Sequence, residues 1–172
     1  LREADVDLRT IGMMTWVGLA YGFKWLWAPI VDHLRIPFLC RLGRRRSWLL
    51  LTQMTLMVSL LGLAFVDPQK SLHTTFLLAL LTAFASATQD ITLDAYRIES
   101  AENEKQAALA ATYQTGYRLA MIWAGAGALA LAAWKGQNGI YDYLSWRFSY
   151  SVMAASMLAV SYTHLRAHET GA

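Results

Sequence analysis

The chain has 172 residues, of which 56% are hydrophobic and only 16% are charged, against roughly 25% charged residues in an ordinary soluble domain. Its net charge of +3 comes from basic residues that stand between apolar runs, which is not the pattern of a nucleic-acid-binding face. The lone cysteine, Cys40, excludes an internal disulfide framework and a cysteine-rich metal cluster.

Five apolar runs follow one another along the chain, separated by short polar segments. A helix needs about 20 mostly apolar residues to cross the hydrocarbon core of a bilayer. The run at residues 48–66 (WLLLTQMTLMVSLLGLAFV) is apolar on all sides, which argues against the alternative of a soluble helical bundle. We therefore predict an all-α, polytopic membrane helix bundle with spans at residues 11–31, 48–66, 72–95, 107–133 and 146–160, the last of which is short.

The basic residues predict which way these spans run. Short cytoplasmic loops carry an excess of Lys and Arg. The connection between the first two spans is rich in arginine, whereas the next one has Lys70 beside Asp67. This pattern places the arginine loop inside the cell and residues 1–10 outside. The arginines of the loop are Arg35, Arg41, Arg44, Arg45 and Arg46.

Both ends of the chain differ from a complete bundle. Because residues 1–10 are expected outside, we expect a further span before them. At the other end, residues 161–172 (SYTHLRAHETGA) have no apolar periodicity and follow a span that is too short to cross. We expect this tail to be a non-native junction; the alternative is a natural polar terminus. Residues 1–160 would then form one partial domain.

Four ionisable residues lie inside the predicted spans, where each costs about 2.5–3.5 kcal/mol. They are Lys24, Asp90, Asp94 and Arg118. At about 1.5 Å per residue, Arg118 lies roughly 16 Å from the cytoplasmic end of its span, Lys24 about 10 Å and Asp90 about 8 Å. Asp94 lies near the surface. Charges at such depth are candidates for a functional site.

Helical spacing gathers polar side chains around these charges. Ser86, Asp90 and Asp94 share one face of their span, which is predicted to form a polar wall of an internal cavity. A carboxylate poised between burial and a nearby cation can bind and release a proton, and Asp90 is the deeper candidate. The alternative is that Asp90 and Lys24 form a buried ion pair that only fixes packing. The other predicted cavity residues are Tyr21, Trp25, Gln89, Gln114 and Tyr117.

The arginine loop begins at Asp32 and ends with GRRRSW, which opens the next span. The plain interpretation is topogenic charge with attraction for anionic lipid. The arrangement also resembles the loop motif of the major facilitator superfamily, G-x-x-x-D-R-x-G-R-R, although Ala28 and His33 depart from it and an insertion precedes Gly43. The resemblance implies a cytoplasmic gate latch. Its residues would be Asp32, Gly43, Arg44, Arg45 and Arg46.

Five segments carry the resemblance further, to the AmpG muropeptide permeases. They are DLRTIG, AYGFKWLWAPIVD, GRRRSWLLLTQ, ASATQDITLDAYRIE and GYRLAMIWAG, in the order of that family, and the insertion before GRRR is itself AmpG-like. The resemblance implies a major facilitator fold. This chain would cover helices two to six of the amino-terminal half, without the first helix and the carboxy-terminal half.

The resemblance also implies a function. It implies a multi-pass permease of the bacterial inner membrane that imports anhydro-muropeptides (GlcNAc–anhydroMurNAc, with or without peptide) together with protons. Such import serves peptidoglycan recycling and feeds β-lactamase induction. The expected partners are membrane lipid, the muropeptide and protons, with no cofactor and no nucleic acid. By residue chemistry, Tyr21, Trp25 and Tyr117 are candidates to stack on sugar rings, and Lys24 and Arg118 to pair with peptide carboxylates.

Two alternatives stay open beside this interpretation. One is a facilitator for another substrate such as acetyl-CoA, because the acetyl-CoA transporters are similar to this family. The other is a non-transporting membrane scaffold whose charges only hold helices together. We expect no enzymatic activity and no metal site, because the sequence has no nucleophile elbow, no phosphate loop and no histidines at metal-ligand spacing.

Overall fold

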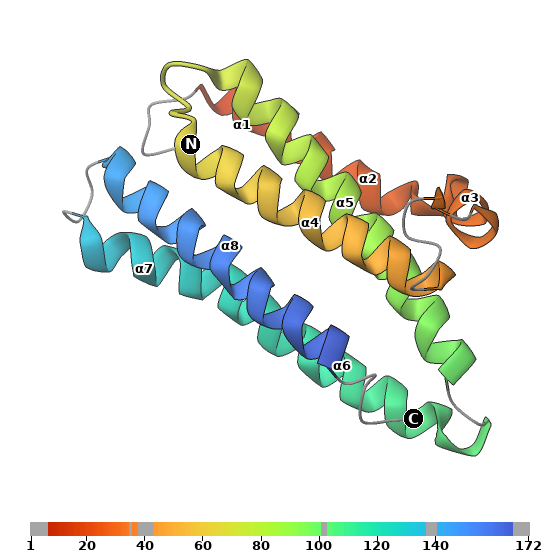
Figure 1. Cartoon of the computed structure of the whole chain (residues 1–172). Coiled ribbons are helices and arrows are strands. Elements are labelled where there is room, and N and C mark those ends of the chain that lie inside the picture. The colour runs from red at the N-terminus through yellow and green to blue at the C-terminus, as the bar shows by residue number, and fades with distance from the viewer. Residues whose placement is uncertain (1–6, 35, 38–42, 101–102, 137–140, 167–172) are drawn as a thin grey trace.

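The computed structural model describes residues 7–34, 36–37, 43–100, 103–136 and 141–166, so that Cys40, Arg35 and Arg41 lie outside the described residues. The described part of the chain is helical and contains no strand, which confirms the predicted all-α class (Figure 1). The elements are α1 (Leu8–Met14), η1 (Thr15–Gly18), α2 (Leu19–Gly22), η2 (Lys24–Leu26), α3 (Ala28–His33), α4 (Arg44–Phe65), α5 (Leu72–Ser100), η4 (Asn103–Lys105), α6 (Gln106–Ile122), η5 (Trp123–Gly127), α7 (Ala128–Lys135) and α8 (Tyr143–Arg166).

The stretch predicted as a span at residues 11–31 is broken into short α and 3-10 segments. Pro29 has no N–H to donate to the carbonyl of Trp25, and its ring clashes with that carbonyl in a regular helix. The 3-10 turn η2 ends at Leu26, and Pro29 stands in the first turn of α3, where its missing N–H has no intrahelical acceptor to lose. Gly18 and Gly22 lower the helix propensity further upstream, each by about 1 kcal/mol relative to Ala.

Three helical runs in the described part of the chain are long and apolar enough to cross a membrane: Arg44–Phe65, Leu72–Glu99 and Gln106–Lys135. They correspond to the predicted spans at 48–66, 72–95 and 107–133, and they identify the chain as a multi-pass membrane segment. The third run joins α6 to α7 through the single π-helical turn η5.

Helix α8 begins at Tyr143, before the predicted start at residue 146, because Asp142 caps it. The Asp142 carboxylate accepts hydrogen bonds from the backbone N–H groups of Leu144 (3.1 Å) and Ser145 (3.2 Å). The Ser145 hydroxyl, with these two N–H groups, holds the pKa of Asp142 below its usual range. The helix continues to Arg166, beyond the predicted end at residue 160.

Helix α4 lies between α5 and α8, and α7 packs along α8 (Figure 1). Small side chains allow this close contact: a Cβ atom on Gly62 of α4 would lie 2.9 Å from the side chain of Leu78 on α5. Ser59 lies about one turn before Gly62 on α4, and its Oγ accepts a hydrogen bond of 2.9 Å from the Thr82 hydroxyl of α5. The α4–α5 contact is therefore built from small and hydroxyl side chains at these positions.

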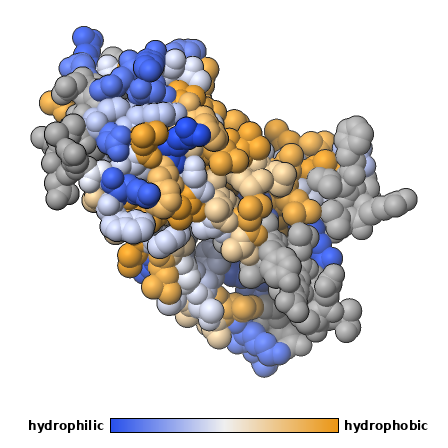
Figure 2. All heavy atoms as spheres, turned by 60° about the vertical axis from the view of Figure 1, so that its left-hand side comes forward, coloured by the Kyte–Doolittle hydropathy of each residue, from blue (hydrophilic) through white to orange (hydrophobic). Residues whose placement is uncertain are grey.

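Large hydrophobic side chains remain exposed on the long helices. Figure 2 shows hydrophobic residues across the middle of one face of the molecule, with hydrophilic residues toward its ends. Exposed apolar faces on helices of this length are the surfaces expected to contact lipid. Examples on α4, α6 and α8 are Leu51, Met54, Val58, Phe65, Leu119, Ile122, Leu144 and Leu158.

Candidate functional site

The first candidate site is the contact between η2 and α5. Lys24 lies on η2 and Asp90 on α5, and the Lys24 ammonium forms an ion pair with Oδ2 of Asp90. The two side chains are 35% and 21% exposed, so the pair is partly shielded. The structure thus brings together two of the four charges that the sequence places inside the spans.

A tyrosine from α6 completes this contact. The Tyr113 hydroxyl donates a hydrogen bond of 3.0 Å to Oδ1 of Asp90. Both carboxylate oxygens of Asp90 are therefore engaged, one by an ammonium on η2 and the other by a hydroxyl on α6. The sequence prediction missed Tyr113, although its spacing of four residues from Tyr117 places it near the predicted polar face of that helix.

Two further side-chain bonds join the first segments to α5. The Tyr21 hydroxyl, which was predicted to line the cavity, is hydrogen-bonded to Ser86 Oγ. The Trp27 indole donates a hydrogen bond of 3.2 Å to Thr88 Oγ1, and its ring stacks on Phe84 at a centroid distance of 4.5 Å. These contacts hold α2 and α3 against the same helix that carries Asp90.

The indole that contacts α5 is thus Trp27, a residue that the sequence prediction did not select. The predicted Trp25 is mostly exposed. Gln89 lies next to Asp90 on α5, and its Oε1 atom is buried with no hydrogen-bond donor among the described residues. That oxygen is an unused acceptor one residue before Asp90 along the chain.

The other two predicted intramembrane charges and the last two predicted cavity residues have no hydrogen bond to Lys24 or Asp90 among those of the described residues. Asp94 forms an ion pair of 3.6 Å with Arg97 one turn along α5, and the Arg97 guanidinium lies 5.1 Å from the centre of the Tyr113 ring. Arg118 is exposed on α6, and no ion pair of the described residues includes it. The predicted cavity residues Gln114 and Tyr117 are also exposed on α6. Their roles stay predictions.

The arrangement places one carboxylate between a cation and a hydroxyl donor. A proton on Asp90 would remove the negative charge that attracts Lys24 and would turn a carboxylate acceptor into a hydroxyl donor. In the described part of the chain, no group of three or more His, Cys, Asp or Glu side chains is placed to hold a metal ion.

A second cluster joins the two ends of the predicted arginine loop. Arg45, at the start of α4, donates to Asp32 Oδ1 of α3 at 2.6 Å and to Glu99 Oε1 of α5 at 2.6 Å. Arg44 lies 3.7 Å from the same Glu99 carboxylate. Three helices, α3, α4 and α5, are therefore joined through one guanidinium, whose side chain is only 13% exposed.

Among the other residues of the predicted gate loop, Gly43 has a structural role and Arg46 does not contribute to the cluster. Gly43 adopts a φ of +85°, a conformation that side-chain-bearing residues rarely adopt, which accounts for a glycine directly before α4. Arg46 is exposed. Glu99 was not among the predicted gate residues. Its signal was topological: successive spans alternate in direction, so the end of the 72–95 span falls on the same side of the membrane as the arginine loop.

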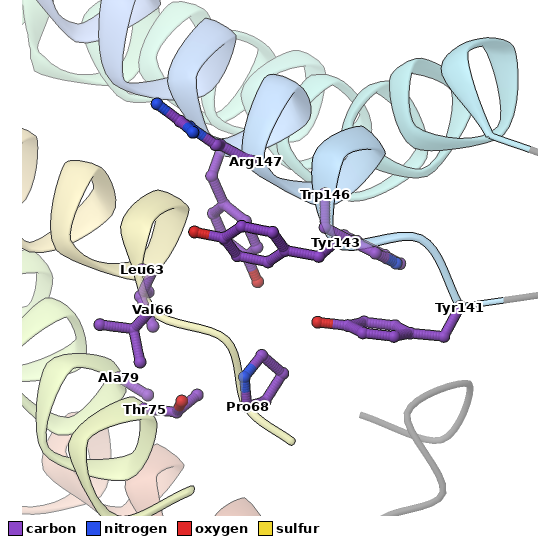
Figure 3. A pocket seen from close by; sticks show the side chains of 10 residues that line it. Leu63, Val66, Pro68, Thr75, Ala79, Tyr141, Tyr143, Trp146 and Arg147 are labelled. Atoms are coloured by element: carbon purple, nitrogen blue, oxygen red, sulfur yellow. The ribbon is translucent and has the colours of Figure 1, made fainter. Parts of the chain in front are cut away.

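A pocket of about 190 Å³ lies at the opposite end of the long helices, where α4 ends and α5 and α8 begin (Figure 3). We call it the aromatic pocket. Tyrosine and tryptophan side chains stand on one side of it, and small apolar side chains on the other. Its lining residues are Leu63, Val66, Pro68, Thr75, Ala79, Tyr141, Tyr143, Trp146, Arg147 and Tyr150.

A hydrogen bond joins one tyrosine of the aromatic pocket to the connection between α4 and α5. The Tyr141 hydroxyl donates a hydrogen bond of 3.0 Å to Oδ1 of Asp67, and burial together with the neighbouring Asp67 carboxylate raises the pKa of this phenol. The sequence prediction missed the pocket, because its residues come from two connections far apart along the chain. Single tyrosines near span ends carry no signal of such a meeting.

Comparison with known proteins gives two kinds of match. The family model for "Acetyl-coenzyme A transporter 1" matches residues 2–76. The chain is 44% identical over 138 residues to the "Anhydromuropeptide permease" of Escherichia coli (strain K12), covering 80% of this chain and 28% of that protein. It is 37% identical over 154 residues to the "Putative transporter AmpG 4" of Rickettsia conorii, covering 90% of this chain and 36% of that protein.

A third relative shows the same proportions. The "Putative transporter AmpG 1" of Rickettsia prowazekii is 36% identical over 140 residues, which cover 81% of this chain and 32% of that protein. The chain thus spans between 28% and 36% of the length of these curated relatives.

Proposed function

We propose that this chain, whose expected resemblance to the AmpG-type permeases these matches confirm, is part of a bacterial inner-membrane permease that imports anhydro-muropeptides together with protons. The observation that carries the proposal is the 44% identity over 138 residues to a protein named for that substrate. On this proposal the import would return GlcNAc–anhydroMurNAc, with or without peptide, for peptidoglycan recycling and would feed β-lactamase induction.

Asp90 is the residue proposed to couple transport to protons. Its two carboxylate oxygens contact η2 through Lys24 and α6 through Tyr113. Protonation would weaken the first contact by removing its charge and would change the second from acceptance to donation. A proton at Asp90 would thereby alter how two neighbouring segments are held against α5, which is what a coupling site requires.

Substrate binding is proposed for the polar side chains around this pair. Tyr21, Trp25 and Tyr117 offer aromatic faces for sugar rings, and the amides of Gln89 and Gln114 offer hydrogen bonds for hydroxyl and acetamido groups. Lys24 and Arg118 are the cations proposed for peptide carboxylates. The unused, buried Oε1 of Gln89 is the feature of the described structure that supports a bound donor most directly.

The cluster around Arg45 is proposed as the cytoplasmic latch. It joins α3, α4 and α5 through Asp32 and Glu99 at the end of the bundle that carries the arginine loop. Opening toward the cytoplasm would separate these helices and break the ion pairs, so their strength would bias the protein toward the closed side.

The test is uptake of labelled GlcNAc–anhydroMurNAc by cells that lack their own permease and express the complete protein. We expect uptake by the wild type that a protonophore abolishes, and loss of uptake in Asp90→Asn at equal membrane expression. Asp94→Asn is the matched control, because Asp94 pairs only within its own helix in the described structure. Wild-type expression without uptake, or full protonophore-sensitive uptake by Asp90→Asn, would contradict the proposal.

Acetyl-CoA transport is the second candidate, favoured by the family model that matches residues 2–76. Lys24 and Arg118 would suit its phosphates as well as peptide carboxylates, so the charges do not separate the two substrates. A competition experiment separates them. If the muropeptide is the substrate, unlabelled acetyl-CoA should leave the uptake of labelled disaccharide unchanged, whereas unlabelled disaccharide should abolish it. The scaffold alternative instead predicts no flux of either compound.

A further inference from the structure

The aromatic pocket lies where lipid headgroups meet a membrane helix bundle. Leu63 and Val66 lie at the end of α4, Ala79 lies near the start of α5, and Trp146 lies near the start of α8 (Figure 3). All three helix ends are opposite the arginine cluster, so they face the other leaflet. Tyrosine and tryptophan side chains are favoured at this depth, because their apolar rings and polar tips suit the headgroup region.

The pocket has a cation at its edge that no anion of the described residues engages. The Arg147 guanidinium lies 4.5 Å from the centre of the Phe65 ring, and this side chain is in none of the ion pairs of the described structure. Contact with an aromatic face fixes the guanidinium plane while its N–H groups stay available at the edge. Arg147 is also exposed, so a ligand can reach it.

A second cation, Lys70, lies in the connection between α4 and α5. Lys70 lines a neighbouring hollow that shares Val66 and Tyr143 with the aromatic pocket. One anion, Asp67, lies in the same hollow, and its Oδ1 accepts hydrogen bonds from the Tyr141 hydroxyl and, at 3.1 Å, from the Gln69 N–H. Asp142, between the lining residues Tyr141 and Tyr143, is a second carboxylate, and its oxygens accept hydrogen bonds at the start of α8. Both carboxylates already accept hydrogen bonds, whereas Arg147 and Lys70 are in no ion pair of the described structure, so an anionic ligand would have two available partners.

The apolar side of the pocket selects among such ligands. Leu63 and Ala79 form part of its wall, and the exposed Phe65 and Leu144 continue that apolar surface along α4 and α8. A free inorganic ion would leave this surface uncovered, whereas a phospholipid would place its phosphate at Arg147 and its acyl chains along the helices. The fork of a guanidinium matches phosphate oxygens in a bidentate way.

We propose that the aromatic pocket binds the headgroup of an anionic phospholipid, with Arg147 as the principal phosphate ligand and Lys70 as its support. Basic pockets between membrane helices bind anionic headgroups by this chemistry. The site would tie the ends of α4, α5 and α8 together through a lipid of the leaflet opposite the arginine loop. This inference is independent of the transported substrate.

The test is titration of the complete protein in detergent with short-chain phosphatidylglycerol or phosphatidylcholine, followed by native mass spectrometry of the bound lipid. We expect a retained phosphatidylglycerol and weaker retention of phosphatidylcholine. Arg147→Gln should lower the phosphatidylglycerol affinity about fivefold, the effect of one basic residue near a membrane surface, and Arg147→Lys should restore part of it. Lys135→Gln is the matched control, because Lys135 also lies over an aromatic ring, that of Phe148, but outside the pocket.

Three outcomes would overturn the proposal. Equal phosphatidylglycerol affinity in Arg147→Gln and the wild type would remove Arg147 as the ligand. Equal retention of phosphatidylcholine would remove the preference for an anionic lipid. Displacement of the retained lipid by free GlcNAc–anhydroMurNAc would assign the pocket to a sugar instead.

Discussion

Helix α5 makes two contacts of opposite character. Toward α4 it packs through small side chains, with Gly62 against Leu78 and Thr82 bonded to Ser59. Toward η2 and α6 it uses a charge, because Asp90 holds Lys24 and Tyr113. Close packing depends on shape and does not change with protonation, whereas an ion pair can be switched by one proton. The comparison indicates which side of α5 is fixed and which can respond.

Breaking the charged contact should have the largest effect. Either Lys24→Gln or Asp90→Asn alone leaves one partly shielded charge without its partner, whereas the double variant removes both. We expect the single variants to lose thermal stability, with a coupling energy of about 0.5–3 kcal/mol recovered in the double variant. Thermal unfolding of the purified complete protein in detergent measures this cycle.

Transport should separate from stability in the same set of variants. Because the proton is proposed to bind Asp90 itself, the double variant should recover stability but not protonophore-sensitive uptake. Recovery of both together would mean that the pair only fixes packing, and additive stability losses would mean that the ion pair contributes nothing.

The packed contact offers the contrasting experiment. Gly62→Val should destabilise the protein by about 1–3 kcal/mol, because the added side chain would overlap the methyl groups of Leu78 and force that side chain to move. Leu78→Ala in the same chain should recover part of that loss by making room. We expect the pH dependence of uptake to match the wild type in every variant that folds. A shifted pH profile would show that this side of α5 also takes part in the response to protons.

The sequence identified the charged residues Lys24 and Asp90, but it did not identify Tyr113 and Glu99, which bind the charged groups in the structure. The depth of Lys24 and Asp90 within apolar runs was visible along the chain, since such charges are costly wherever they occur. Tyr113 and Glu99 were missed because their partners are fixed by how α5 meets α6 and α4. Pro29 was a local signal for a break in the helix, but the prediction gave more weight to the length of the apolar run.

A third comparison concerns the proposed latch, where Arg45 forms ion pairs and the neighbouring Arg46 is exposed. Arg45→Gln removes ion pairs to Asp32 and Glu99, each of which is worth about 0.2–1 kcal/mol because the carboxylates are well exposed. The neighbouring Arg46→Gln is the matched control and should change stability by less than about 0.5 kcal/mol. If the cluster is a latch, Arg45→Gln should also make a cysteine introduced beside Glu99 more reactive toward a water-soluble thiol reagent. Equal reactivity in both variants would argue against a gate.

The smallest change of structure is Tyr113→Phe, which deletes one hydroxyl and keeps the ring under Arg97. The lost hydrogen bond to Asp90 should cost about 0.5–1.5 kcal/mol, close to what a purely structural bond would cost. The distinguishing measurement is the pH profile of uptake. Without the Tyr113 hydroxyl, the Asp90 carboxylate loses its contact with α6, so the pH profile of uptake should differ from that of the wild type. Tyr117→Phe, four residues along α6, should leave the profile in place, and a profile unchanged in Tyr113→Phe would separate α6 from the response to protons.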